Sequence, residues 1–541
     1  MAIESEIQMM EQKASLPAEE IDLTTGSVSR RDNGFRRKAI SVTILVLATA
    51  YFIASLVITP AKPWGRVAIY GLVFIKVLFE FVPIEFVTKP IELAWRPVGD
   101  RISRVSGRRK GGIGGVVIVF LALGVTYGFD ETELGTRIQR SQSMLGIVVF
   151  LTLMGATSRD CRRINWHTVA TGILLQLLVG LFVMRTETGS GVFAFLSQMT
   201  SELLKFASTG SEFVLGQDLA NVKGFAFLVL PGILFFSSFV QIMYYLGVMQ
   251  WIITKSAGFF KVVMNTTVCE SVVAAASPFV GMGESALLVK PYLVDMTRSE
   301  LHQVMTSGFA TIAGSVLMAF IKMNVDAKSL ITSCVMSIPC SLALSKLRYP
   351  ETEASRTREV VATDDEERES NLLHAAANGA AQGITLCLLI GGTLLAIISL
   401  LALTNAVLGV LGLYIGYQSL TLELIGSYFF WPFAWLIGIP KENCLKVGGL
   451  LATKLFANEF VAYINLTTMS NTPGELDKRS AILATYALCG FANFASIGIQ
   501  VGCLGAMAPS RKRDLAELAM SAMITGTICT FVSAAIAGLL I

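Results

Sequence analysis

Two short polar strings lie inside strongly hydrophobic sequence and contain the side chains best suited to bind a solute. The first occupies residues 277–284 and ends in Glu284, and the second occupies residues 452–463 and contains Glu459. An ionisable side chain inside a membrane costs free energy, and such residues usually serve a function. We therefore take Glu284 and Glu459 as candidate functional carboxylates.

Each of these strings is followed about thirty residues later by a second matching string. Residues 308–315 follow the first, and residues 490–496 follow the second. The spacing is 30 residues from Phe279 to Phe309 and 31 residues from Phe460 to Phe491. A broken polar element followed by a span with a polar face, occurring twice, predicts a duplicated transporter core that holds its substrate between the repeats.

The later strings carry polar side chains at helical spacing. Asn493 and Ser496 are three residues apart and Thr311 and Ser315 are four apart, so each pair would share one helix face. Glu459 only accepts hydrogen bonds when ionised, whereas Asn and Ser donate and accept, so together they can satisfy the vicinal hydroxyls of a sugar. The alternative is that Thr, Ser and Asn bond across helices as part of packing.

Two residues beside Glu459 add to this pattern. Asn458 places a second amide, besides Asn493, in the same apolar neighbourhood. Because burying several polar side chains in a membrane costs free energy, a purely structural role for Glu459, Asn458 and Asn493 is disfavoured. Lys454 lies four residues before Asn458 and is a candidate structural counter-charge to a carboxylate.

The composition indicates an integral membrane protein. Of 541 residues, 53% are hydrophobic and 15% are charged, against about 25% charged in soluble domains. The net charge of +4 gives no indication of nucleic acid binding. Nine scattered cysteines and three isolated histidines predict no disulfide framework, zinc site or other metal cluster, and no cofactor is expected.

The hydrophobic pattern predicts an all-α fold with a lipid bilayer as its surroundings. Residues 1–37 are polar and predict a disordered tail. Residues 263–293 and 423–465 are apolar but interrupted by Gly, Pro and charge, which favours re-entrant hairpins. Spans long enough to cross a membrane are expected at about 39–59, 66–87, 113–129, 144–157, 168–184, 224–248, 301–323, 328–346, 380–403, 480–503 and 515–541.

Basic residues in short loops predict the orientation. Arg and Lys cluster before the first span and after the second and fourth, which places the N-terminus in the cytosol. The basic run 511–513 before the last span places the C-terminus outside. The charged run 359–369 is most simply a solvated loop, and we assign it no role.

At these residues the sequence resembles the concentrative nucleoside transporter family, in the form with three additional N-terminal helices. The resemblance covers residues 140–541 closely and residues 38–130 in architecture. Further matching strings are 350–353 and 507–514. The family signature, (Gly or Ala)-x-Lys-x3-Asn-Glu-Phe-Val-Ala-(Tyr/Phe/Met), is matched in full by Ala452, Lys454, Asn458, Glu459, Phe460, Val461, Ala462 and Tyr463.

The resemblance implies a homotrimeric plasma-membrane symporter in which two hairpins and two partly unwound helices move as an elevator. It assigns the ribose to Glu459, Asn493 and Ser496. It assigns the nucleobase side to the first hairpin, where the family's Gln and Thr are replaced by Met282 and Gly283. The nucleobase-side group is Gly281, Met282, Gly283, Glu284 and Ser315.

The coupling cation is the point at which the chain departs most from the family. The resemblance places cation ligands at Ser277, Val280, Thr311 and Ile312, with Ser277 where the family has Asn. Because a longer amide oxygen is lost there, the sequence narrowly favours proton coupling. Glu284 and Glu459 are the candidate titrating carboxylates, and Glu284 is the freer of the two if Glu459 is held by the sugar. Sodium coupling is the alternative. An integral-membrane enzyme and a channel are more distant readings, and no hydrolase or nucleotide-binding motif accompanies these residues.

Overall fold

A computed structural model of the protein describes residues 43, 46–54, 107–132, 134–220, 225–357, 369–414, 416 and 420–541. The predicted tail 1–37, the predicted span 66–87 and most of the predicted span 39–59 and of the loop 359–369 lie outside these residues. The chain forms two compact units, Met1–Arg104 and Val105–Ile541. The third of the three predicted N-terminal helices therefore belongs to the second unit.

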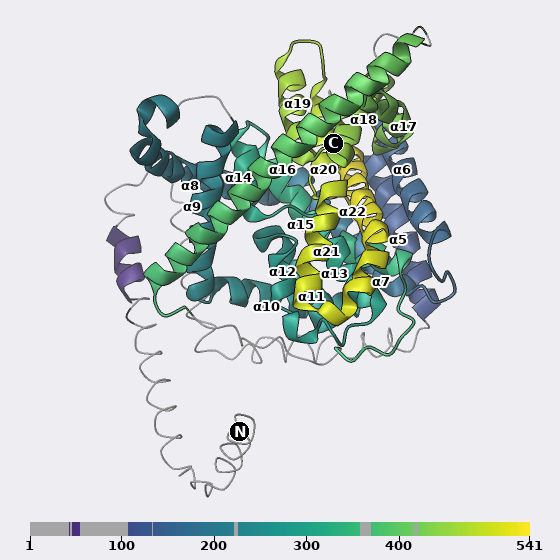
Figure 1. Cartoon of the computed structure of the whole chain (residues 1–541). Helices are drawn as coiled ribbons and strands as arrows, with labels where there is room; N and C mark the ends of the chain where they lie inside the picture. The colour runs from purple at the N-terminus through teal and green to yellow at the C-terminus, as the bar shows by residue number, and fades with distance from the viewer. Residues whose placement is uncertain are drawn as a thin grey trace, which may run out of the picture. The chain divides into compact units, whose positions relative to one another are not determined.

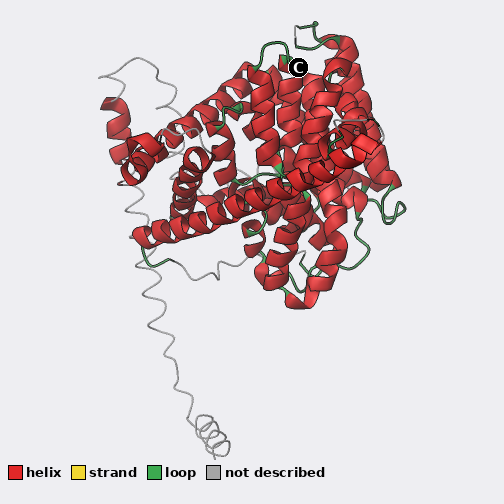
Figure 2. Ribbon diagram, turned by 45° about the horizontal axis from the view of Figure 1, so that its top comes forward, coloured by secondary structure: helices red, strands yellow, loops and turns green. Residues whose placement is uncertain are grey.

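The second unit is built from helices, as Figures 1 and 2 show, and an isolated bridge between Thr132 and Gly135 is a minor exception. Short 3-10 turns occur at Lys290–Tyr292 and Pro509–Arg511. The helices are α5 (Gly107–Gly128), α6 (Arg137–Ala156), α7 (Trp166–Arg185), α8 (Glu187–Ala220), α9 (Phe225–Tyr245), α10 (Val248–Met264), α11 (Val268–Val280), α12 (Glu284–Leu287), α13 (Arg298–Ala310), α14 (Gly314–Lys322), α15 (Ala327–Arg348), α16 (Leu372–Tyr414), α17 (Leu422–Ile437), α18 (Lys441–Phe456), α19 (Glu459–Asn471), α20 (Lys478–Leu488), α21 (Phe494–Met507) and α22 (Lys512–Leu540).

Several of these helices can cross a membrane, as predicted from the hydrophobic runs in the sequence. Among the described residues, 5 spans are long and apolar enough, or up to 7 when each sharply bent helix pair counts as one. The bent pairs are α9 with α10, at 76°, and α17 with α18, at 119°. This is the fold class expected from the sequence.

The structure corrects the predicted spans at three places. The predicted span 480–503 is interrupted, because α20 ends at Leu488 and α21 begins at Phe494. The predicted span 301–323 is interrupted between α13 and α14. The predicted span 380–403 is the middle of α16, which has 43 residues and runs across the unit in Figure 1. Helices α8 and α10 were not predicted at all.

The two halves of the unit repeat one order of elements. In the first half, α11 and α12 flank a short break, α13 and α14 flank a second break, and α15 follows. In the second half, α18 and α19, then α20 and α21, then α22 repeat this order. The predicted second hairpin region 423–465 thus holds three helices, α17, α18 and the start of α19. All four breaks fall on the polar strings that the sequence singled out.

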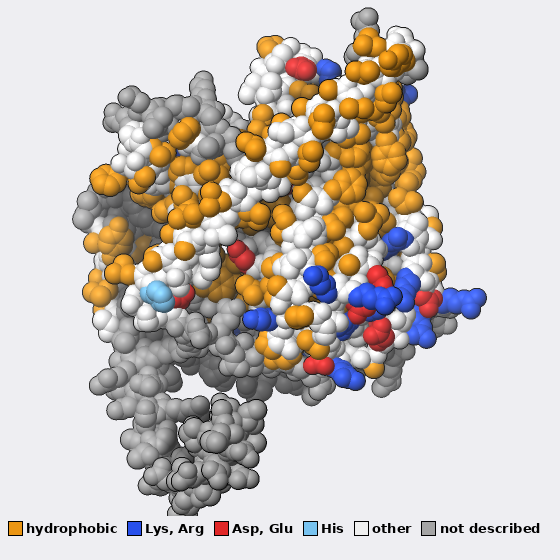
Figure 3. Space-filling view, in the orientation of Figure 1, with side chains coloured by type: hydrophobic (Ala, Val, Ile, Leu, Met, Phe, Trp, Pro, Cys, Tyr) orange, Lys and Arg blue, Asp and Glu red, His pale blue; other side chains and the backbone are white. Residues whose placement is uncertain are grey.

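The buried centre of the unit is formed by α13, α15 and α22. The apolar windows of Arg298–Lys322, α15 and Pro509–Leu540 are each 89% buried within the molecule, against 11% for α16. Small residues let these helices approach closely, since a methyl group on Gly526 would lie 2.5 Å from the Cβ of Phe309. Figure 3 shows a broad hydrophobic surface, with most charged side chains gathered toward one end.

Candidate functional site

The second hairpin places its carboxylate at a helix start. Helix α18 ends at Phe456, and Asn458 caps α19 by accepting a hydrogen bond from the Val461 amide at 3.1 Å. Glu459 is the first residue of α19 and is 4% exposed. The unpaired amides and the dipole of a helix N-terminus favour a negative group there. The break in the hairpin therefore positions Glu459 at a helix N-terminus inside the molecule.

The break between α20 and α21 brings Asn493 to this carboxylate. The Nδ2 of Asn493 donates to Glu459 Oε2 at 2.8 Å, and its Oδ1 accepts from the Ser496 amide at 2.8 Å. All three predicted ribose residues are buried and lie together. The expectation that Asn493 and Ser496 share a helix face was wrong in one respect, because Asn493 is the cap that precedes α21.

Lys454, the candidate counter-charge, makes its hydrogen bonds to two neutral groups. Its ammonium donates to the Ala487 carbonyl at 2.9 Å and to Thr530 Oγ1 at 3.2 Å. Ala487 lies in the last turn of α20, where backbone carbonyls lack helical partners. Lys454 therefore ties the end of α20 to α22, directly before the break that carries Asn493.

The first hairpin turns at a sequence of small residues. Helix α11 ends at Val280, and Gly281 follows with φ of 92°, a conformation that favours glycine. Met282 is partly buried, and Glu284 begins α12 with an exposed side chain. The two candidate carboxylates thus both begin a helix, but only Glu459 is buried.

The predicted cation ligands lie on two segments that pack together. Ser277 Oγ donates to the Val273 carbonyl at 2.7 Å and lies 3.3 Å from Ser285 Oγ. Thr311 Oγ1 donates to the Ser307 carbonyl at 2.9 Å. A methyl group on Gly314 would lie 3.0 Å from the Phe279 carbonyl oxygen, so the end of α11 contacts the break after α13.

Thr311 and Ser315 do not share a continuous helix, contrary to the prediction. Thr311 follows α13 in an extended conformation, and Ser315 lies in the first turn of α14. Ile312 is fully buried between them. In the part of the chain that the structure describes, no group of three His, Cys, Asp or Glu side chains could hold a metal ion.

The two breaks in the repeated helices contact each other. The Phe491 amide donates to the Thr311 carbonyl at 3.2 Å. A methyl group on Gly490 would lie 2.8 Å from the Phe309 carbonyl oxygen. The two backbone segments therefore approach each other without a side chain between them. The matched strings of the two repeats therefore meet at the centre of the unit.

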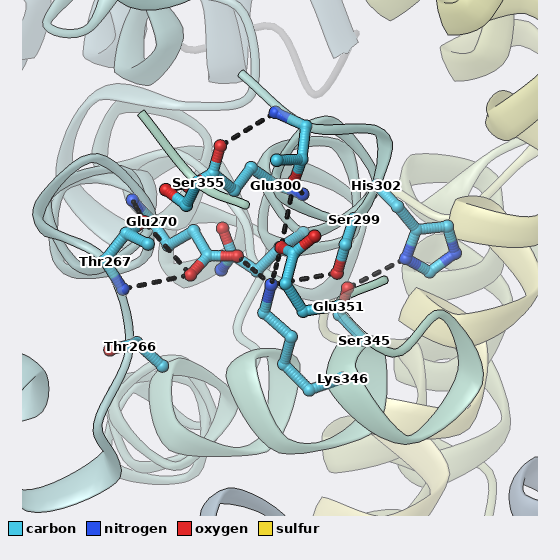
Figure 4. A network of polar contacts seen from close by, with 12 residues as sticks. Thr266, Thr267, Glu270, Ser299, Glu300, His302, Ser345, Lys346, Glu351 and Ser355 are labelled. Atoms are coloured by element: carbon cyan, nitrogen blue, oxygen red, sulfur yellow. Dashed lines mark hydrogen bonds and ion pairs between the residues drawn. The ribbon is translucent and has the colours of Figure 1, made fainter. Parts of the chain in front are cut away.

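A buried polar network at the start of α11 and α13 was largely missed by the sequence reasoning (Figure 4). Lys346 Nζ lies 2.5 Å from Glu270 Oε1 and 3.3 Å from Glu351 Oε2. His302 Nδ1 lies 2.8 Å from Ser345 Oγ. The network joins the starts of the first hairpin and of the first broken helix to the end of α15.

The local signal for this network was present in the sequence. Thr267 with Glu270 and Thr297 with Glu300 are both capping boxes, in which the threonine hydroxyl accepts from the glutamate amide and the carboxylate accepts from the threonine amide. A Thr-x-x-Glu string before an apolar run predicts a helix start. It does not predict that Lys346 contacts Glu270 at the first of these helix starts and Ser299 at the second.

Two broken helices that meet beside two interrupted hairpins define a secondary transporter. Three family profiles match consecutive parts of the chain: "Na+ dependent nucleoside transporter N-terminus" over residues 145–218, "Nucleoside recognition" over 226–326 and "Na+ dependent nucleoside transporter C-terminus" over 329–538. The chain belongs to the family of concentrative, Na+-dependent nucleoside transporters, which are multi-pass membrane transporters and not enzymes.

The similar curated proteins extend across most of the chain. Sodium/nucleoside cotransporter 1 of Oryctolagus cuniculus is 38% identical over 93% of this chain and 77% of its own length. Sodium/nucleoside cotransporter 1 of Mus musculus is 44% identical over 75% of this chain and 64% of its own length. Sodium/nucleoside cotransporter 2 of Rattus norvegicus is 37% identical over 95% of this chain and 79% of its own length.

Solved structures of one relative, CNTnw, match about three quarters of the chain. The chain is 36% identical to CNTnw in an inward-facing substrate-bound state, with a TM-score of 0.70 over 74% of this chain and 97% of that one. An outward-facing state of CNTnw gives a TM-score of 0.72 over 75% and 99%. This fold is therefore one that has been observed open to either side of the membrane.

Proposed function

We propose that this protein is a sodium-coupled symporter that imports nucleosides. The observation that carries the proposal is the hydrogen bond from Asn493 to Glu459, which joins the two broken elements of the second repeat at a buried polar site. Membership of the family of Na+-dependent nucleoside transporters supplies the substrate class. Neither an enzyme nor a channel accumulates its substrate, so accumulation separates this proposal from both.

In this proposal the ribose is held by the second repeat. Glu459 accepts hydrogen bonds from the ribose hydroxyls, while Asn493 and Ser496 supply groups that donate and accept. The hydrogen bond from Asn493 fixes the orientation of the carboxylate. The ribose therefore meets a preorganised site, and a free nucleobase, which offers no hydroxyls, should compete poorly.

The nucleobase is assigned to the first hairpin, with Gly281, Met282, Gly283 and Glu284 at the turn and Ser315 on the neighbouring helix. Met282 has a flexible, polarizable side chain that can lie against a large ring. Gly283 leaves room beside it. These residues support a preference for purine nucleosides with tolerance of uridine.

Sodium replaces the proton as the preferred coupling ion. The named relatives are sodium/nucleoside cotransporters, so the comparisons support the alternative rather than the proton reading. The geometry is compatible with a hard cation, because the hydroxyls of Ser277 and Thr311 each donate their proton to a carbonyl. Thr311 Oγ1 then keeps both lone pairs and Ser277 Oγ, which lies 3.3 Å from Ser285 Oγ, keeps one, so both can coordinate sodium together with the carbonyls of Val280 and Ile312.

The remaining features of the proposal follow from the resemblance and the charge pattern. We place the protein in the plasma membrane as a homotrimer, with a cytosolic N-terminus and an extracellular C-terminus. The loop charges support the orientation. The states observed for CNTnw support an elevator movement of the hairpins and broken helices against the other helices.

The test is uptake of labelled adenosine and uridine in cells without endogenous nucleoside transport, with sodium and external pH varied independently. We expect accumulation in sodium that is lost when choline replaces it at constant pH. Accumulation in choline that is driven by external acid would overturn sodium coupling and restore the proton reading. Equilibration without accumulation under every condition would overturn the symporter proposal itself.

A further inference from the structure

One face of α21 runs from the ribose residues to the tip of the first hairpin. Asn493, Ser496, Gln500 and Cys503 follow one another at intervals of three, four and three residues. Asn493 is the cap that precedes α21, and within the helix the intervals between Ser496, Gln500 and Cys503 keep these side chains on one face. The first two belong to the proposed ribose site, and the function proposed above has not used the other two.

Gln500 is fully buried and only partly hydrogen-bonded. Its Nε2 donates to the Met305 carbonyl of α13 at 3.2 Å. Its Oε1 is buried and finds no hydrogen-bond partner among the residues that the structure describes. Because Nε2 carries two protons, one N–H and the whole carbonyl oxygen are left for another group.

The amide nitrogen of Gln500 lies close to the tip of the first hairpin. A methyl group on Gly308 would lie 2.6 Å from Gln500 Nε2 and 2.7 Å from Met282 Cβ. A methyl group on Gly283 would lie 2.9 Å from Cys503 Sγ. The hairpin tip therefore packs against α21 at Cys503 and lies close to Gln500, and both approaches are possible because residues 283 and 308 have no side chains.

The tip itself has no side-chain amide that could hydrogen-bond to a nucleobase, since Met282 and Gly283 occupy its turn. Ser496, the neighbour of Gln500 on the ribose side, is one helical turn away. A nucleoside with its ribose at Glu459 and its base against the first hairpin would bring the base edge toward this side chain. Met282 is flexible enough to move aside for the ring.

We propose that Gln500 determines nucleobase specificity by pairing with the edge of adenine. This inference rests on the nucleoside transport proposed above. A glutamine amide can accept from the adenine N6 amine and donate to N7 at the same time. Guanine presents two acceptors, O6 and N7, on the same edge, so its O6 opposes the amide oxygen. The arrangement selects adenosine over guanosine among purine nucleosides.

The experiment compares adenosine with two analogues in sodium-driven uptake, 7-deazaadenosine, which lacks N7, and purine riboside, which lacks the exocyclic amine. We expect the wild-type protein to show a KM for each analogue roughly tenfold above that for adenosine, as one lost partner of a bidentate pair implies. In Gln500→Met, the KM for adenosine should rise to that of the analogues and the discrimination should disappear. Gln500→Asn, with a shorter amide, should lose most of it.

Gln176→Met on α7 is the matched control. Gln176 is also fully buried, its Nε2 donates to Ser533 Oγ at 2.8 Å, and its Oε1 likewise has no partner among the described residues. This variant should keep the wild-type discrimination between adenosine and its analogues. Equal loss in both variants would overturn a role for Gln500 in specificity and leave only a role in packing.

The wild-type measurements separate failure of this inference from failure of the proposed function. Sodium-driven adenosine uptake with equal KM for both analogues would overturn the pairing and leave the transport function intact. Absence of any nucleoside accumulation would overturn both. Because these measurements need no variant, the inference stays testable even if Gln500→Met fails to reach the membrane.

Discussion

The tips of the two hairpins occupy equivalent places in the repeats but are built in opposite ways. At the second tip, Asn458 and Glu459 are buried and each is held by a hydrogen bond to a fixed group. At the first tip, Gly281 and Gly283 lack side chains, and Glu284 is exposed. One repeat thus presents a rigid polar site and the other an adaptable one.

The difference has a physical reason. Hydrogen bonds in a low-dielectric interior are strong, and an unpaired buried group is costly, so a polar site there must be almost fully satisfied before substrate arrives. Such a site suits the ribose, which every nucleoside shares. A tip of small and flexible residues can accept bases of different size, and its selectivity must come from a neighbouring element.

The largest effect is expected at the rigid tip, for Glu459→Ala. Removing the carboxylate leaves the Asn493 amide unsatisfied, at a cost of about 1–3 kcal/mol or more, and removes the acceptor for ribose. Uptake should fall to background while the protein still reaches the membrane, which surface labelling would check. Glu442→Ala, an exposed glutamate on the preceding helix, is the control. Normal uptake by Glu459→Ala would show that the ribose site lies elsewhere.

A smaller but severe loss is expected for Asn493→Ala. This change removes both the cap of α21 and the donor to Glu459, and a lost cap alone costs about 0.5–2 kcal/mol. The KM for adenosine should rise more than the thermal stability falls.

Asp477→Ala supplies the comparison for this variant, because Asp477 caps α20 in the same way without contacting Glu459. It should lower thermal stability with little change in KM. If the two variants have the same KM for adenosine, the hydrogen bond from Asn493 to Glu459 does not contribute to substrate binding.

An intermediate effect is expected at the adaptable tip, for Gly283→Ala. The added methyl group would lie 2.9 Å from Cys503 Sγ, so the tip must move away from α21. We expect a reduced uptake rate that is partly restored in the double variant with Cys503→Ala, which removes the sulfur. Uptake kinetics of the four proteins form a double-mutant cycle. Additive effects would mean that the tip and α21 do not touch during transport.

The smallest effect is expected for Ser277→Asn under sodium coupling. The native hydroxyl already leaves a lone pair for the cation, so a longer amide oxygen should change the half-saturating sodium concentration little. The check is adenosine uptake as a function of sodium at fixed pH. Conversion of a sodium-independent, acid-driven uptake into a sodium-sensitive one would instead favour the proton reading.

Much of the fold and part of the site could be predicted from the sequence. The polar strings that interrupt hydrophobic sequence predicted the hairpins, the repeat and the importance of Glu459, because such groups are too costly to place in a membrane without a partner. Helices α8 and α10 were missed. The breaks after Thr311 and before Asn493 were missed in detail, since a cap and its third residue have the same spacing as two residues on one helix face.

The sequence by itself determined which side chains must find polar partners inside the membrane, because composition and local spacing suffice to recognise a buried charge, a capping string or a repeat. Only the tertiary structure decided who those partners are. Asn493 meets Glu459 across 34 residues of chain, Lys454 donates a hydrogen bond to the end of α20, and Gln500 lies close to Met282. The pattern of hydrophobic residues predicts which side chains are buried, whereas the contacts between distant segments depend on how the helices pack.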